Sequence, residues 1–169
     1  MQKEVPFAIA LESRYPEQVA VAVVRDLQGH YNPITLGWVM PVSMQPPMLA
    51  MALGRNRYTA ESLRQSREFV LAFPSEAQAE AAKYFGSHTG RDTHKLAMVR
   101  CETERAHKVD SRLLTEAVAN FECKLVREVE AGDHIVFFGE VVACHVHANP
   151  ASRLYTLIKS QHMGGFRQK

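Results

Sequence analysis

Two arginines beside a predicted helix start are the residues whose types and spacing suggest chemistry most clearly. Arg55 and Arg57 follow an apolar run and come just before Thr59, which we predict as the N-cap of a helix. Free N–H groups at a helix N-terminus and the forked guanidinium groups of arginine both bind phosphate oxygens. We therefore predict a phosphate site at these three residues. The alternative is an ordinary solvated surface, where arginines near a helix start are also common.

Predicted strands lead into this site and follow it. Apolar or alternating runs rich in strand-forming residues predict strands over 18–25, 31–42, 48–53 and 68–73. Pro41 inside the second run predicts a bend or a sheet edge. The Gln45-Pro46-Pro47 sequence predicts a corner before the third strand.

Two short helices are predicted between the strands. The first covers 59–65, with Thr59 as its N-cap and Glu61 in the first turn, where the helix dipole favours an acid. The second covers 76–85, with Ser75 as its N-cap and Gly86 just past its end.

The second half of the chain is dominated by a predicted hairpin. Its arms are residues 118–127 and 134–147, with Gly132-Asp133 as the turn. Both faces of the second arm are largely apolar, so it is covered on two sides or contacts another subunit. The tail from residue 154 is predicted to be weakly structured. About six strands and two helices indicate a mainly β fold, a barrel with short helical insertions, formed by residues 1–169 as a single domain.

Composition excludes several classes of protein. A net charge of +2 over 169 residues is too small to predict binding to nucleic acid or to an anionic membrane surface. The three cysteines, Cys101, Cys123 and Cys144, form no pair with metal-binding or redox spacing. The N-terminal apolar run is too short to span a bilayer. We therefore expect a cytoplasmic protein with reduced thiols.

Several short motifs occur in order between residues 16 and 139. Each motif is weak alone, but their joint order and spacing are specific. They are Asn32-x-x-Thr35-x-Gly37-Trp38, Pro41-Val42-Ser43-x-x-Pro46-Pro47, Glu68-Phe69-Val70, Gly90-x-Asp92-x-x-Lys95, Phe121-Glu122-Cys123 and Gly132-Asp133-His134-x-x-x-x-Gly139-Glu140-Val141. In this set the chain resembles the flavin reductase-like, FMN-binding split-barrel family, which implies a split β-barrel of Greek-key type.

The resemblance also implies an activity. Members of this family are typically homodimers that bind FMN or FAD at the subunit interface. Many reduce flavin with NADH or NADPH, transferring hydride to flavin N5. The alternatives are a flavoredoxin-like FMN electron carrier, the reductase partner of a two-component monooxygenase, or a barrel that has lost its cofactor. No separate nucleotide-binding domain is evident, so a nicotinamide must stack against the flavin in the same cleft.

With FMN as the expected cofactor, the residues around the predicted phosphate site take roles. Arg55, Arg57 and Thr59 would bind the phosphate, and an apolar wall for the ring would come from Trp38, Met40 and Leu53. The groups expected to reach the ribityl chain and the ring edge are Asn32, Thr35 and the backbone of Ala52, Leu53 and Gly54. The family often has a small polar residue where this chain has Gly37, so a backbone contact is expected there.

The remaining candidates lie further along the chain. In the resemblance His134 corresponds to a histidine near the nicotinamide or the flavin edge, and we predict it as the catalytic residue; a solvated turn histidine is the alternative. Gly90 and Lys95 are expected in a loop that covers the flavin from the second subunit, or in an ordinary exposed loop. His145 and His147 share one strand face, as two metal ligands would, but without a third ligand nearby we predict no metal site.

Overall fold

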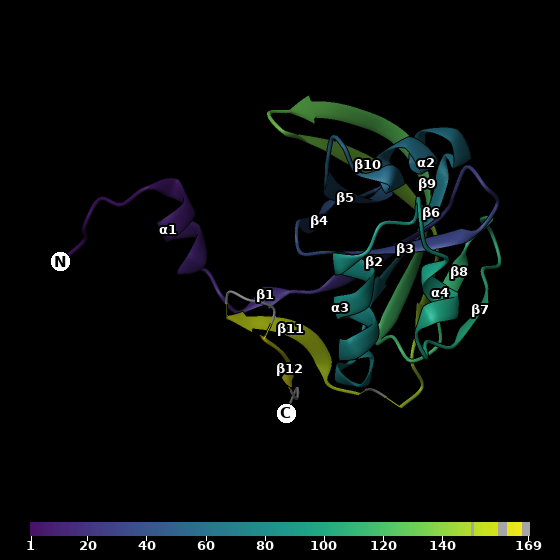
Figure 1. Cartoon of the computed structure of the whole chain (residues 1–169). Helices are drawn as coiled ribbons and strands as arrows, with labels where there is room; N and C mark the ends of the chain where they lie inside the picture. The colour runs from purple at the N-terminus through teal and green to yellow at the C-terminus, as the bar shows by residue number, and fades with distance from the viewer. Residues whose placement is uncertain (150, 159–161, 167–169) are drawn as a thin grey trace.

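A seven-stranded antiparallel sheet forms the body of the protein in the computed structural model, which describes residues 1–149, 151–158 and 162–166 (Figure 1). The strand order is β3-β2-β6-β9-β10-β5-β4. The strands are β2 (Ala20–Arg25), β3 (Tyr31–Leu36), β4 (Val39–Met44), β5 (Pro47–Gly54), β6 (Glu68–Phe73), β9 (Ala119–Ala131) and β10 (His134–Val146). The predicted mainly β split barrel is confirmed.

The sheet closes on itself at the residues that end the first family-like motif. Its two edge strands, β3 and β4, are consecutive in the chain and are separated by only Gly37 and Trp38. Because so short a link cannot cross a flat sheet, the sheet must curl until its edges meet. The predicted single strand over 31–42 is therefore two strands, broken at Gly37.

The apolar core lies on both faces of this sheet. Inside the barrel, Met51, Leu63, Phe69 and Phe137 are fully buried. On the outer face of β2 and β6, valines pack against helix α3 (Ala79–Ser87) and against a small hairpin of β7 (Thr103–Arg105) and β8 (Arg112–Leu114). This explains why the predicted strand over 18–25 is apolar throughout: residues 19–24 are all buried.

Three helices surround the opening of the barrel. Helix α2 (Tyr58–Ser66) follows β5, and a 3₁₀ turn, η1 (Glu76–Gln78), leads into α3. Helix α4 (Lys95–Met98) is a single turn that packs near β3. None of the described helices is long and apolar enough to cross a membrane.

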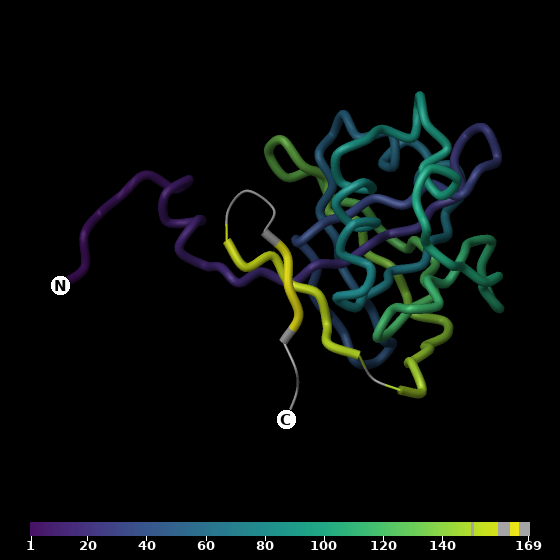
Figure 2. Tube along the Cα trace, turned by 60° about the horizontal axis from the view of Figure 1, so that its bottom comes forward, coloured from purple at the N-terminus to yellow at the C-terminus, as the bar shows by residue number. Residues whose placement is uncertain are grey.

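Segments near the two ends of the chain pair with each other outside the barrel. Strands β1 (Glu17–Gln18), β11 (Arg153–Ile158) and β12 (His162–Phe166) form a small separate sheet. Helix α1 (Phe7–Glu12) projects from it on an arm, clear of the barrel in both views (Figures 1 and 2). The predicted weakly structured tail was wrong, because β11 finds backbone partners on both of its sides.

Two predicted helix ends were also wrong. Helix α2 begins at Tyr58 with Arg57 as the residue before it, since the Ala60 N–H already binds the Arg57 carbonyl at 2.9 Å. Gly86 lies inside α3 rather than after it. A side chain there would meet Thr35, whose Cβ lies 3.4 Å from an added Cβ, so close helix–strand packing explains this glycine.

The long hairpin of β9 and β10 was predicted correctly. Its turn is Gly132-Asp133, and Gly132 has a φ of 60°, a conformation that other residues rarely adopt. The arms continue to Ala131 on one side and start at His134 on the other. The hairpin thereby places His134 opposite Gly54, at the end of β5.

Candidate functional site

A groove made of two adjoining clefts holds most of the residues predicted to bind the cofactor. The smaller cleft, about 150 Å³, lies between the start of α2, the end of α3 and the loop before α4; we call it the helix cleft. The larger, about 190 Å³, lies where β3, β4, β5 and β10 approach one another; we call it the strand cleft. Ile34, Arg57 and Gly86 line both clefts, so the two are continuous.

The structure brings together all of the predicted site residues except two. Arg57, Thr59, Gly90 and Lys95 line the helix cleft. Thr35, Gly37, Trp38, Ala52, Leu53, Gly54 and His134 line the strand cleft. Asn32 and Arg55 line neither cleft.

Lys95 is the most unusual residue of the helix cleft. It is only 2% exposed, and its Nζ donates to the Phe85 carbonyl oxygen at 3.2 Å. Burial lowers the pKa of Lys95 to about 8, and the positive charge of Arg57 contributes. Neither Lys95 nor Arg57 forms an ion pair with any described acid. A buried amine beside a second positive charge, the exposed Arg57, favours an anion next to them.

The Thr59 hydroxyl is positioned by a buried hydrogen bond. Asn32 Nδ2 donates to Thr59 Oγ1 at 3.0 Å, and both residues are 2% exposed. Because Thr59 Oγ1 accepts this bond, its own O–H remains available to donate into the helix cleft. Gly90 packs directly on Asn32, where an added Cβ would collide with Asn32 Oδ1. Asn32 therefore positions two residues of the cleft and does not line it.

The loop that carries Gly90 belongs to the same chain as the cleft that it covers. Arg91 pairs with Glu61 of α2, and its guanidinium lies 5.0 Å from the centre of the Tyr58 ring. Together with Lys95 on Phe85, these contacts hold the loop against its own α2 and α3. The cleft that the loop closes is built within one chain. That the loop also covers a flavin of the second subunit stays a prediction.

Arg55 points away from the groove. Its Nε donates to the Gly132 carbonyl at 2.6 Å and its Nη1 lies 3.0 Å from Glu130 Oε2. The cause is the strand register, since β5 pairs with β10 as far as Gly54 and His134 and carries the next residue to the hairpin turn. The sequence spacing predicted that Arg55 and Arg57 lie together at one site. The structure places them apart, with only Arg57 in the groove.

The strand cleft has an aromatic edge. The rings of Trp38 and His134 lie 4.6 Å apart between centres and are tilted by 35°. His134 Nδ1 lies 2.7 Å from Asp133 Oδ1, and this hydrogen bond lowers the pKa of Asp133. Because a carboxylate only accepts, neutral His134 carries its proton on Nδ1 and presents Nε2 as an acceptor.

Thr35 and Gly37 form the floor between the edge strands. Thr35 Oγ1 donates to the Ala82 carbonyl at 2.6 Å, which ties β3 to α3. An added Cβ at Gly37 would lie 2.6 Å from the Glu17 carboxyl group. The roles of Glu17 and Gly86 were missed by the sequence analysis, because nothing in the local pattern shows that β1 and α3 pass so close to this floor.

A third cleft continues from the aromatic edge. It measures about 650 Å³ and lies between α1 and strands β4 and β5; we call it the arm cleft. It shares Gly37, Trp38 and Ala52 with the strand cleft and adds Met40, which was predicted as part of the apolar wall. The groove therefore runs from a cationic end at Lys95 to an apolar end at Met40.

These features define the class of protein: a mainly β split barrel with a groove, cationic at one end and aromatic at the other. A family model described as a flavin reductase like domain matches residues 12–163. The chain therefore belongs to the flavin reductase-like family, as the motif order indicated.

Individual relatives agree with this assignment. A protein of unassigned function from Archaeoglobus fulgidus is 34% identical over 111 residues, which are 66% of this chain and 63% of that protein. An NADH-dependent FAD reductase from Streptomyces globisporus is 28% identical over 101 residues, 60% of this chain and 55% of that one. The chain spans only 52% to 64% of the length of three such relatives from archaea.

A solved structure shares the fold. The crystal structure of an FMN-binding protein from Thermus thermophilus, with bound 1-cyclohex-2-enone, matches with a TM-score of 0.83 at 24% identity. The match covers 100% of this chain and 95% of that one.

The groove fits a flavin on its own chemistry. The buried Lys95 and the exposed Arg57, both without an ion-pair partner among the described residues, suit a phosphate or pyrophosphate group, and the start of α2 adds free N–H groups. Trp38, which is 39% exposed, offers apolar surface to a flat ring, and the residues from Ala52 to Gly54 on β5 line the same cleft.

Proposed function

We propose that this protein is an NAD(P)H-dependent flavin oxidoreductase that binds FMN and transfers hydride from NADH or NADPH to flavin N5. The observation that carries the proposal is the buried Lys95 beside Arg57, at one end of a groove whose other end is aromatic. FMN has the same polarity, a phosphate dianion at one end and an apolar ring at the other. The flavin supplies the redox chemistry, and the chain binds and orients it.

The phosphate would be held by Arg57, Lys95 and Thr59. Charge-assisted hydrogen bonds contribute about 1.5–3 kcal/mol each, and the helix dipole adds about 0.3–1 kcal/mol. Micromolar affinity needs about 8 kcal/mol in net terms, so contacts to the ring are also required. We assign these to Trp38 and Leu53, with the backbone from Ala52 to Gly54 at the polar ring edge.

The arm cleft is the proposed place for the nicotinamide. It opens directly from Trp38, and its volume of about 650 Å³ accommodates a second ring system. His134 lies at the boundary, against Trp38, where its Nε2 can accept a hydrogen bond from a bound nucleotide. Its proposed role is to orient the two rings, since in the family resemblance it corresponds to a histidine near the nicotinamide or the flavin edge.

Reduction by nicotinamide under anaerobic conditions tests this proposal. The purified protein is loaded with FMN, freed of excess flavin, and mixed with NADH or with NADPH while the visible flavin absorption is followed. Rapid bleaching by one of the two nucleotides is expected. Bleaching by dithionite but by neither nucleotide would refute the reductase and favour the electron carrier. Failure to retain or quench any flavin would refute both.

The proposed assembly is a homodimer. Phe7 and Ile9 on α1, and Met40 and Met44 on β4, are all at least half exposed. Exposed apolar side chains gathered on neighbouring elements are typical of protein interfaces. Since Met40 belongs to this set and lines the arm cleft together with Trp38, a second subunit here would complete the ring end of the groove. A cytoplasmic location and a partner oxygenase or other redox protein remain part of this proposal.

A further inference from the structure

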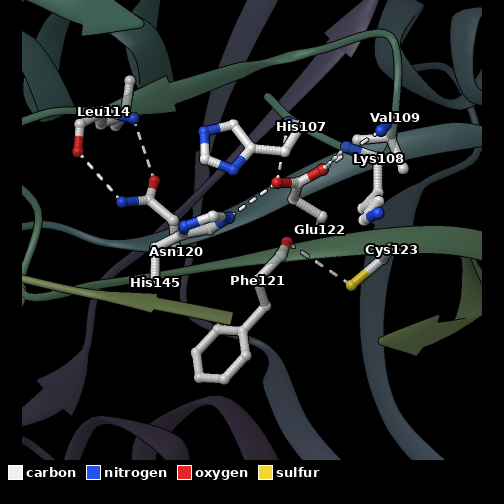
Figure 3. Close-up of polar contacts among 9 residues, drawn as sticks. All are labelled: His107, Lys108, Val109, Leu114, Asn120, Phe121, Glu122, Cys123 and His145. Atoms are coloured by element: carbon white, nitrogen blue, oxygen red, sulfur yellow. Dashed lines mark hydrogen bonds and ion pairs between the residues drawn. The ribbon is translucent and has the colours of Figure 1, made fainter. Parts of the chain in front are cut away.

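Three side chains with metal-binding atoms converge at a place that the flavin groove does not use. They are His107, in the loop between β7 and β8, Glu122 on β9 and His145 on β10. One ligand atom from each lies within 4.8 Å of the other two. Figure 3 shows the two imidazole rings next to the Glu122 carboxylate.

The strand register explains how Glu122 and His145 meet. His145 is paired with Asn120, which lies two residues before Glu122 and therefore on the same face of β9. Glu122 and His145 are thus diagonal neighbours on adjacent strands, within reach of each other. His145 Nε2 lies 2.7 Å from Glu122 Oε1.

Asn120 brings the third residue to this face. Its side chain accepts from the Leu114 N–H at 2.9 Å and donates to the Leu114 carbonyl at 3.1 Å, which holds β8 on the sheet (Figure 3). The β7–β8 loop then lies over Glu122. His107 is consequently supplied by tertiary packing, 15 residues before the glutamate in the chain.

Glu122 is a rigid, ionised ligand. It is fully buried, and its oxygens accept the backbone N–H groups of His107 at 2.9 Å, Lys108 at 2.5 Å and Val109 at 3.1 Å. Burial alone raises the pKa of Glu122, but the N–H groups of His107 and Lys108, with His145, outweigh burial and hold the pKa below its usual value. Hydrogen bonds to a carboxylate of this kind orient it as a metal ligand.

The two histidines have different surroundings. The His107 side chain is exposed, and its ring makes an edge contact with His145, 4.8 Å between centres, with no hydrogen bond to the described residues. His145 is partly buried. His147, by contrast, turns to Asn149, whose carbonyl oxygen lies 2.5 Å from its Nδ1. The sequence showed no further ligand beside His145 and His147. The structure supplies Glu122 and His107 to His145, but not to His147.

We propose that His107, Glu122 and His145 bind a divalent transition-metal ion, and that Zn²⁺ is the ion whose chemistry fits best. Two imidazoles and one carboxylate form an established zinc ligand set, with the fourth position left to water. Zinc–ligand bonds of about 2.0–2.2 Å bring ligand atoms to about 3–3.5 Å from one another, so the exposed His107 ring moves inward. The ion takes the place of the proton on His145 Nε2, and neutral His145 then carries its proton on Nδ1, the transfer between the two nitrogens passing through solvent.

The ion would fasten the β7–β8 loop to β9 and β10. Only the folded chain brings the three ligands together, so binding raises the unfolding temperature. None of the three residues lines the flavin groove, so the site is independent of the proposed reductase activity.

Metal titration of the full chain tests the proposal. Chelator-treated protein is titrated with Zn²⁺ in competition with a chromophoric chelator, with Co²⁺ as a spectroscopic probe, and its unfolding temperature is measured with and without Zn²⁺. We expect one ion per chain and a higher unfolding temperature with zinc. Loss of an outer hydrogen-bond partner alone weakens metal sites by about 10–100-fold, so His107→Ala should weaken binding at least tenfold.

Control variants separate this site from a surface histidine pair. His145→Gln can still donate to Glu122 and should lose zinc affinity as His107→Ala does. His147→Ala, two residues further along the chain and just past the end of β10, should bind zinc like the unmodified protein. The proposal is overturned if His107→Ala binds unchanged, if His147→Ala loses the ion, or if no ion binds. Glu122→Gln is unsuitable as the primary variant, because Glu122 also holds three backbone N–H groups.

Discussion

Lys95 and Arg57 place two positive charges in a small cleft that contains no described acid. Three other arginines of this chain behave differently from Arg57: Arg55, Arg64 and Arg91 each pair with a glutamate. A buried amine without a counter-ion loses hydration and is repelled by its neighbour, which is why the pKa of Lys95 falls to about 8. An anionic ligand reverses both effects, so the unpaired charges are best explained as a preformed phosphate site.

Arg57→Ala should weaken FMN binding by about 10–100-fold, because a charge-assisted hydrogen bond contributes about 1.5–3 kcal/mol. Riboflavin, which lacks the phosphate, should be affected far less. Quenching of flavin fluorescence measures both affinities. Arg55→Ala is the matched control, and it should bind FMN almost normally because Arg55 contacts Gly132 and Glu130 instead. Equal losses of FMN and riboflavin would show that Arg57 acts through folding.

The affinity for FMN should depend on the charge of Lys95. The charged amine attracts phosphate, so affinity is full below a pH of about 8 and falls as the pH rises above that value. Bound phosphate itself raises the pKa of Lys95, so the affinity for FMN continues to fall until the pH reaches the higher pKa of the complex. Titrations from neutral to alkaline pH, with riboflavin in parallel, measure the effect. Lys95→Met should abolish the difference between the two ligands' pH profiles, and a decline shared equally by riboflavin would contradict the assignment.

The β7–β8 hairpin is attached to the barrel by two polar side chains of β9. Asn120 binds both backbone groups of Leu114, and Glu122 binds three successive N–H groups of the loop. Both side chains are nearly or fully buried. Polar groups at this depth are costly when unpaired, so these bonds define where the hairpin sits. The Phe121-Glu122-Cys123 motif thus has a structural explanation that its sequence did not show.

Glu122→Gln should destabilise the fold by about 1–3 kcal/mol, because the amide cannot accept from all of the same N–H groups. Since folding lowers the pKa of Glu122, its stabilisation is present above the carboxyl's ordinary pKa and is lost as the pH falls through the folded value. Urea unfolding in the presence of a chelator measures the free energy of unfolding of both proteins. The variant should be less stable by the whole expected amount at neutral pH and by a smaller amount in acid. A constant difference at every pH would contradict an ionised Glu122.

At the scale of the whole molecule, several of the apolar residues that the fold leaves most exposed lie on the two elements that line the arm cleft, α1 and β4. Met44 on β4 is 88% exposed, and Phe7 on the projecting helix α1 is 75% exposed. Strand β4 is an edge strand, and α1 has no buried residue. An arm without a core contact and an apolar edge are both explained if a second copy of the chain covers them.

Met40→Glu combined with Met44→Glu should convert the proposed dimer into a monomer and weaken flavin binding. Charges at the centre of an interface must be desolvated on association, which opposes dimerisation. Sedimentation measures the change, with 19.0 kDa expected for one chain. Val126→Glu is the control, since Val126 is also exposed but lies on β9. A flavin-loaded unmodified protein that sediments as a monomer would contradict the shared site.

Local patterns predicted the elements whose signals are contained in short stretches of sequence. The β9–β10 hairpin was predicted from alternating apolar residues around Gly132, and β6 from its apolar run. The errors fell where a distant segment decides the local conformation. Thr59 is hydrogen-bonded by Asn32 rather than capping α2, and Gly86 sits inside α3 because β3 passes beside it.

The sequence alone determined the mainly β fold, the order of the family motifs and most residues of the groove, because these depend on periodicity and on residue type. Only the tertiary structure decided which arginine faces the groove, how deeply Lys95 is buried and that His107 reaches Glu122. Each of these depends on strand register and on packing between segments distant in the chain. Residue spacing places Arg55 and Arg57 together, but the pairing of β5 with β10 sends them to different partners.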